Sequence, residues 1–245
     1  MKIDVLTLFP EMFAAVKTSM LGRAEKNGLL EINLVNIRDY TLNKHKRVDD
    51  YPFGGGVGML MQAEPIFRSL QAINAADKKI IYMSPKGKIL NQEKIKELSK
   101  EENLVVLCGH YEGIDQRILD YWDVEEISIG DYILTGGEPA AIVMIDAVSR
   151  MIPGVLGHQE GVMEESIYSG LLEAPQYTKP REYEGLAVPD VLLSGHHENI
   201  HLWQFEEALK VTKERRPDLF EEYLKNHGPL TKTEKKILEK ICSLV

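Results

Sequence analysis

Long apolar runs and paired cysteines are both missing from this 245-residue chain, and each absence excludes a class of protein. No stretch approaches the roughly 20 consecutive apolar residues that a membrane-spanning helix needs. The apolar run at residues 1–5 is too short for a signal peptide and is typical of a first strand. Cys108 and Cys242 lack metal-ligand spacing, so we expect two buried apolar thiols rather than a disulfide. We therefore expect a cytoplasmic protein with no membrane partner.

Several common ligand-binding motifs are missing as well. The chain has no Gly-x-Gly-x-x-Gly fingerprint, no phosphate-loop Lys-Ser/Thr signature and no helical pair of zinc-binding histidines. His196 and His197 are adjacent, and adjacent residues on a helix do not face the same way, so we assign no metal site.

The balance of charge is acidic, with a formal net charge of −9. This average argues mildly against a nucleic-acid partner, but phosphate binding depends on local basic patches. Such patches occur at 44–47, 179–181 and 213–216. Each of them alone is typical of a solvated face of an acidic protein.

What the first 150 residues do contain is a regular alternation of apolar strands and amphipathic helices. The expected strands cover residues 2–8, 30–37, 79–83, 104–108 and 126–129, and the expected helices cover 11–26, 65–76, 91–100, 115–121 and 140–150. This spacing is that of βαβ crossovers and predicts an α/β domain with a mostly parallel sheet covered on both faces. Residues 38–61 lack periodicity and become rich in glycine, which predicts a mobile functional arm near the site.

The pattern changes after Arg150, where glycine, proline and acidic residues become frequent. A helix is expected over residues 197–215, and Thr231 with Glu234 forms a capping box for a last helix. The C-terminal part is therefore expected to be a small, mostly helical domain.

Three expected strands end in glycine-containing turns. The strand ends are followed by Ser84–Gly87, Gly109–Gly113 and Gly130–Gly137. Glycine tolerates positive φ and lets a ligand lie against bare backbone, and the helix that begins near Ala140 adds unpaired N–H donors. Turn geometry alone explains many single loops of this kind. Three of them at one edge of a parallel sheet predict a cleft for a flat heteroaromatic ligand.

Seven short motifs, spread over nearly the whole chain, resemble those of one enzyme family. They are Leu8–Phe13, Val48–Asp50 with Gly54–Met59, Cys108–Asp115, Ser128–Tyr132, Ile152–His158, Pro175–Thr178 and Val191–Gly195. In these residues the chain resembles the bacterial tRNA (guanine-N1)-methyltransferases of the trefoil-knotted (SPOUT) superfamily.

The resemblance implies a fold and an activity. It implies a knotted S-adenosylmethionine-binding domain over residues 1–158 with a deep C-terminal trefoil knot, a linker over 159–174, and a helical tRNA-binding domain over 175–245. It implies a homodimer with active sites at the subunit interface. The implied reaction methylates N1 of the guanosine 3′ to the tRNA anticodon (m1G37). The alternatives are a knotted methyltransferase acting on another RNA position and a non-catalytic RNA-binding protein.

The resemblance also implies roles for particular residues. The methyl donor would contact Tyr82, Met83, Ser84, Pro85, Gly109, Tyr111, Glu112, Gly113, Ile129, Gly130, Asp131, Tyr132, Ile133, Leu134, Gly136 and Gly137. The anticodon arm of tRNA would contact Lys44, Arg47, Asp50, Arg181 and Arg215.

Two further residues are expected to carry the chemistry. Glu165 stands where the family often has an aspartate base, with Glu164 and then Glu173 as alternatives. Arg150 is the candidate for stabilising charge on the guanine, although a cation at a helix C-terminus is also favourable by itself. The resemblance is compatible with Mg²⁺ at guanine O6, but the sequence offers no carboxylate cage to which a site could be assigned.

Overall fold

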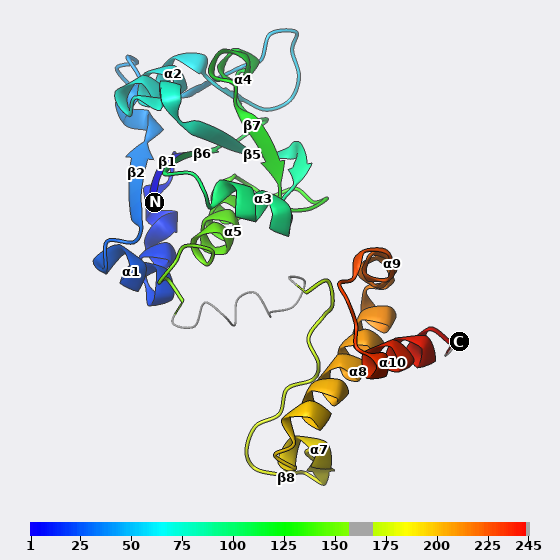
Figure 1. Ribbon diagram of the computed structural model, residues 1–245. Coiled ribbons are helices and arrows are strands. Elements are labelled where there is room, and N and C mark those ends of the chain that lie inside the picture. The colour runs from blue at the N-terminus through cyan, green and yellow to red at the C-terminus, as the bar shows by residue number, and fades with distance from the viewer. Residues whose placement is uncertain (157–168, 244–245) are drawn as a thin grey trace. The chain divides into compact units, whose positions relative to one another are not determined.

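A five-stranded parallel sheet forms the centre of the first unit in the computed structural model, which describes residues 1–156 and 169–243 (Figure 1). The chain divides into two units, Met1–Gln159 and Glu160–Val245. The strands lie in the order β2 (Glu31–Asn36), β1 (Lys2–Thr7), β6 (Asn103–Cys108), β5 (Lys79–Ile89) and β7 (Glu125–Ser128), and all neighbours are parallel. The predicted α/β class with a mostly parallel sheet is confirmed, and the knot stays a prediction.

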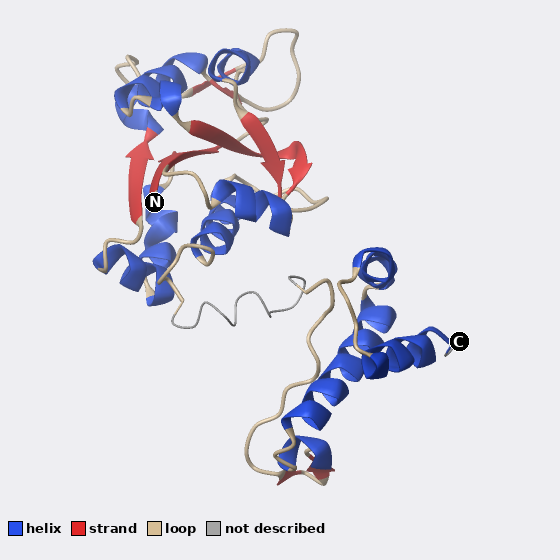
Figure 2. Cartoon of the chain, viewed as in Figure 1, coloured by secondary structure: helices blue, strands red, loops and turns tan. Residues whose placement is uncertain are grey.

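Helices cover both faces of this sheet, as Figure 2 shows. One face packs against η1 (Pro10–Lys17), α1 (Ser19–Lys26), α3 (Gln92–Leu98) and α5 (Glu138–Ser149). The other face packs against η2 (Ile37–Tyr40), α2 (Ala63–Ala72), η3 (Ala75–Asp77) and α4 (Gln116–Trp122). Successive strand residues point to opposite faces, so Ile81 and Met83 enter the first core while Ile80 and Tyr82 enter the second. Burial on both sides explains why the central strand β6 is apolar from Leu104 to Cys108.

The prediction of a single helix over residues 11–26 is wrong, because the helix is interrupted at Thr18. Thr18 is extended, with φ −115° and ψ 174°, and Ser19 has a φ of 54°. The Thr18 hydroxyl donates to the carbonyl of Ala15 at 2.6 Å. Threonine and serine side chains compete with the helical hydrogen-bond pattern in this way, which separates the 3₁₀ helix η1 from α1.

Strand β5 is longer than predicted and replaces the loop expected after Met83. It continues to Ile89, and its register with β7 shifts between Met83 and Lys88. At this irregularity Gly87 has no room for a Cβ atom against the backbone of Glu126 and Ile127. Glycine at this position therefore lets the two strands approach closely.

The glycine-rich arm predicted over residues 38–61 contains the antiparallel pair β3 (Asp49–Asp50) and β4 (Leu60–Met61). Backbone hydrogen bonds join the arm to the Gly109–Gly113 turn, from the Met61 N–H to Gly113 O at 3.0 Å and from the Glu112 N–H to Met59 O at 2.9 Å. The arm thus lies directly against one of the predicted ligand-binding turns.

The second unit is mostly helical, with a short hairpin. Its elements are β8 (Glu182–Tyr183), β9 (Leu186–Ala187), α7 (Asp190–Leu193), α8 (His197–Arg215), α9 (Pro217–Asn226) and α10 (Lys232–Ser243). The Thr231–Glu234 capping box is confirmed, because the Thr231 N–H donates to Glu234 Oε2 at 2.7 Å and the Glu234 N–H donates to Thr231 Oγ1 at 3.2 Å. Leu171 packs into the core of this unit, so the packed chain begins earlier than the predicted boundary at residue 175.

Two further expectations from the sequence concern membrane-spanning helices and the two cysteines. Within the described ranges, no helix combines the length and apolar character required to cross a membrane. Cys108 is a buried free thiol, as expected. The prediction for Cys242 is wrong, because this free thiol is exposed on α10, whose buried residues are Leu238 and Ile241.

Candidate functional site

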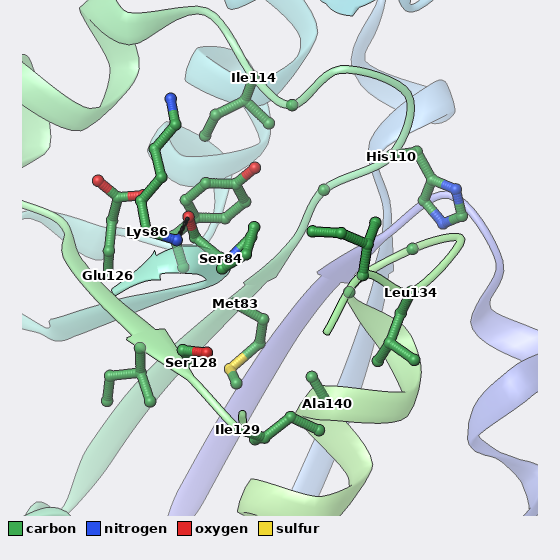
Figure 3. Close-up of a pocket in the computed structure, with 18 of the residues that line it drawn as sticks. Met83, Ser84, Lys86, His110, Ile114, Glu126, Ser128, Ile129, Leu134 and Ala140 are labelled. Atoms are coloured by element: carbon green, nitrogen blue, oxygen red, sulfur yellow. Dashed lines mark hydrogen bonds between the residues drawn. The ribbon is translucent and has the colours of Figure 1, made fainter. Parts of the chain in front are cut away.

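A pocket of about 260 Å³ opens beside the irregular part of β5, where β6 and β7 end and α5 begins (Figure 3). This volume is close to the lower end of the roughly 300–1,000 Å³ typical of small-molecule sites. Of the sixteen residues predicted to hold the methyl donor, fifteen line this pocket, and Asp131 does not. It is further lined by residues that were not among the predicted donor contacts, such as Lys86, His110, Ile114, Glu126, Ser128 and Ala140. The structure therefore brings the two glycine-containing turns after β6 and β7 to one cavity, together with the part of β5 around Ser84 that was predicted to be a turn.

The pocket extends over both faces of the sheet at its carboxyl edge. Met83, Ile127 and Ala140 belong to the first core and make an apolar end. Tyr82 belongs to the second core and lies across from Glu126 in the β5–β7 register. Figure 3 shows Ala140 at one end of the pocket and Glu126 at another. A bent ligand with one flat apolar part and one polar part suits this shape.

Close packing of glycines makes main-chain atoms part of the wall. A Cβ atom on Gly109 would lie 2.6 Å from Tyr82 Oη, and one on Gly137 would lie 3.0 Å from Cys108 Cα. A side chain at Gly109 would therefore enter the cavity or displace Tyr82. The cavity depends on bare backbone at these turns, as a ligand bound by N–H and C=O groups requires.

A buried hydrogen-bond network holds the turn and the helix together beside the pocket. Glu138 is 0% exposed, and its two carboxylate oxygens contact Thr7 Oγ1 at 2.6 Å and His110 Nε2 at 2.7 Å. Thr7 Oγ1 in turn accepts from the Phe9 N–H at 2.9 Å. The network connects the end of β1, the turn after β6 and the first residue of α5. Burying a carboxylate costs free energy unless it is hydrogen-bonded, and these two contacts provide Glu138 with its partners.

Sequence reasoning missed the roles of Glu138 and His110. An acidic residue in the first turn of a helix normally complements the helix dipole at the surface. A histidine in a glycine-rich loop is equally compatible with polar contact and with plain solvation. Burial of Glu138 arises from tertiary packing, and the sequence carries no local signal for it.

Two ionisable groups at the site have pKa values raised by burial. Burial, followed by the charges of Glu126 and Cys108, raises the pKa of Tyr82 to about 12. Its hydroxyl therefore stays protonated at neutral pH and can donate a hydrogen bond. Burial, followed by the charge of Glu138, raises the pKa of the Cys108 thiol well above its usual value. Cys108 is therefore an unreactive core residue.

Among the predicted catalytic residues, Arg150 is described and does not line this pocket. Arg150 follows the last residue of α5 and does not line the cavity, whereas Ala140 of the same helix does. Ten residues of helix place their Cα atoms about 15 Å apart. Glu164 and Glu165 lie outside the described residues. Glu173 is exposed in the second unit.

The predicted tRNA-binding residues are all exposed and fall in both units. Lys44, Arg47 and Asp50 lie in the arm, whereas Arg181 and Arg215 lie in the second unit. In the part of the chain that is described, no three His, Cys, Asp or Glu side chains are grouped to hold a metal ion. Mg²⁺ therefore has no candidate site among these residues.

The fold and the pocket define a class of protein, an α/β protein whose ligand site lies at the carboxyl edge of a parallel sheet. Residues 1–222 match the family model described as tRNA (Guanine-1)-methyltransferase TrmD. The chain therefore belongs to this family.

Curated relatives agree with the family match over nearly their full length. A tRNA (guanine-N(1)-)-methyltransferase of Clostridium perfringens is 61% identical over 90% of this chain and 94% of its own. Proteins of the same name from Clostridium acetobutylicum and Clostridium botulinum are each 56% identical, over 97% and 98% of this chain and 96% and 98% of their own.

Proposed function

We propose that this chain transfers a methyl group from S-adenosylmethionine to N1 of the guanosine 3′ to the anticodon, position 37 of tRNA. The observation that carries the proposal is the pocket itself, which gathers fifteen of the sixteen residues that the family resemblance assigns to the donor. Family membership supports a tRNA (guanine-N1)-methyltransferase activity. A cytoplasmic location follows from this substrate.

The donor fits the two-ended pocket. The flat adenine suits the apolar end beside Ile129 and Ala140, where main-chain groups of the Gly130–Gly137 turn can bind its edge. The polar end beside Tyr82 suits the rest of the molecule. Bound S-adenosylmethionine supplies a methyl group already activated on a sulfonium, so the protein need not activate the donor.

The protein must instead activate the acceptor. Guanine N1 carries a proton at neutral pH and is a poor nucleophile. Glu165 removes this proton, a contribution of roughly 10²–10⁴-fold for a general base. Negative charge then spreads toward O6, where Arg150 stabilises it. Alignment of donor and acceptor lowers the barrier by more than either polar group, by roughly 7–11 kcal/mol.

The position of Arg150 favours a site shared between two subunits. Arg150 lies about 15 Å along α5 from the pocket-lining Ala140 of its own chain, beyond the reach of an arginine side chain. In a two-fold homodimer, each Arg150 can approach the pocket of the partner subunit. We therefore place Arg150 in the active site of the partner, with no metal site assigned.

The exposed basic residues are expected to make salt-dependent phosphate contacts. Replacing Lys44, Arg47, Arg181 or Arg215 with alanine should reduce the slope of log K against log salt concentration by about 1 for each contact removed. Fluorescence anisotropy with labelled tRNA at several salt concentrations measures this slope. Lys100→Ala, at an exposed position outside the basic patches, is the control. An unchanged slope in the four variants contradicts their assignment.

Methyl transfer to defined transcripts tests the proposed function. The purified chain is incubated with S-adenosylmethionine and tRNA transcripts that carry guanosine or adenosine directly 3′ to the anticodon. Only the guanosine transcript should be methylated, and nuclease digestion with mass spectrometry should identify 1-methylguanosine at that position. Methylation elsewhere would indicate a methyltransferase for another RNA position. Binding of both transcripts without methylation would indicate an RNA-binding protein.

A further inference from the structure

One carboxylate in the pocket has a buried oxygen without a partner. Glu126 lines the cavity, and its Oε2 atom is buried and accepts no hydrogen bond from the described residues. Buried polar atoms in native proteins nearly always have a partner, so this atom requires explanation. An ionised carboxylate can only accept hydrogen bonds. The group that satisfies Glu126 must therefore be a donor, and a cation would satisfy it best.

The sheet register places Glu126 at the polar end of the pocket. Glu126 of β7 lies across from Tyr82 of β5, and residues paired across two strands share one face of a sheet. The preceding residue, Glu125, points to the other face. Its carboxylate pairs with Lys79 at 2.7 Å and with Lys94 at 2.8 Å, and it does not line the pocket. Two adjacent glutamates thus have different surroundings, one with two lysine partners and one facing the cavity.

A lysine of opposite charge lies at the same end of the cavity. Lys86 of β5 is exposed and lines the same pocket as Glu126, and in the view of Figure 3 both side chains lie on the side of the cavity away from Ala140. No ion pair joins the two side chains in the described structure, although both line one cavity. The opposite end, beside Ala140, is apolar. The pocket therefore offers an acceptor and a donor at one end and an apolar surface at the other.

We propose that Glu126 binds the α-ammonium group of the methyl donor, with Lys86 beside it binding the α-carboxylate. This inference rests on the proposed function, because it takes S-adenosylmethionine as the ligand of the pocket. The amino-acid end of that molecule is a zwitterion and matches the two side chains in sign. These contacts place the amino-acid part of the ligand beside Glu126 and the adenine beside Ala140. Glu126 is in this sense a binding residue that sets the direction of the ligand.

Two ligands that differ only at the amino-acid end provide the test. S-adenosylhomocysteine carries the ammonium and carboxylate groups, whereas 5′-methylthioadenosine keeps the adenosine and the sulfur but lacks both charges. Calorimetry measures the affinity of each ligand for the full-length protein and its Glu126→Gln variant. We expect the variant to bind S-adenosylhomocysteine roughly 10- to 100-fold more weakly, the loss typical of a charged hydrogen bond. Its affinity for 5′-methylthioadenosine should stay within about twofold of the wild-type value, since this ligand lacks the charged partner.

Control variants separate this effect from general damage to the pocket. Glu125→Gln removes the neighbouring charge outside the pocket and should leave both affinities unchanged. Lys86→Met changes an exposed residue, which a folded protein tolerates, and should weaken S-adenosylhomocysteine alone. Lys86→Met therefore tests the same binding mode without depending on whether Glu126→Gln folds.

Three results would overturn the inference. Equal weakening of both ligands by Glu126→Gln in a folded protein would assign the carboxylate to the ribose hydroxyls, which both ligands share. Unchanged affinities in this variant would assign it no ligand contact. Unchanged binding of S-adenosylhomocysteine by Lys86→Met would remove the paired-charge match. Failure of the wild-type protein to bind S-adenosylhomocysteine or the donor would instead contradict the proposed function.

Discussion

Replacing Glu165 with glutamine is expected to lower kcat by roughly 10²–10⁴-fold, the usual contribution of a general base. Glutamine keeps the size and polarity of the side chain but cannot accept the N1 proton. Because the substitution leaves the donor pocket and the basic residues intact, the affinities for S-adenosylmethionine and tRNA should change little. Single-turnover methylation measures the chemical step, and calorimetry and anisotropy measure the two affinities.

Glu164→Gln is the matched control, because it removes the same charge one residue earlier. If Glu165 is the base, Glu164→Gln should keep nearly full activity. The reverse result would assign the role to Glu164. Full activity in both variants would exclude this pair of carboxylates and direct attention to Glu173.

Replacing Arg150 with alanine is expected to lower kcat by roughly 10²–10³-fold, the loss typical when one donor to a developing oxyanion is removed. A second variant, Gly109→Val, should abolish donor binding because its side chain would occupy the space beside Tyr82. Each variant alone is therefore expected to be nearly inactive. Mixing the two variants distinguishes a site formed within one subunit from a site shared between two subunits.

If Arg150 serves the pocket of the partner subunit, a mixed dimer contains one complete site. Random exchange of equal amounts after mild denaturation and refolding should then restore about a quarter of wild-type activity, since half of the dimers are mixed and each has one complete site of two. If Arg150 serves its own pocket, no dimer has a complete site and the mixture stays inactive. Wild-type protein taken through the same exchange is the control for recovery.

Much of the first unit could be predicted because its central strands are buried on both faces. Apolar runs such as Leu104–Cys108 predict buried strands, and the helices that alternate with them predict that neighbouring strands are parallel. The break at Thr18 and the extension of β5 past Met83 could not be predicted in this way. Both depend on local competition, one from a side-chain hydrogen bond and one from close contact at Gly87.

The pocket could be predicted from its turns, but its charged residues could not. Glycines such as Gly109 and Gly137 have a clear local meaning after a strand and before a helix. Glu126 sits inside a strand, where an alternating polar residue normally faces solvent. Its place in the cavity depends on the register with Tyr82 on β5, which emerges only from the assembled sheet.

The glycine-built wall has a consequence for any inhibitor designed against this cavity. A compound that hydrogen-bonds to the backbone of the Gly109–Gly113 and Gly130–Gly137 turns would depend little on side-chain identity there. A mutation could weaken the binding of such a compound mainly by adding a side chain at Gly109 or Gly137. Because these positions are crowded, the added side chain would also interfere with binding of the natural ligand. Resistance through these turns would therefore come at the expense of the activity it is meant to preserve.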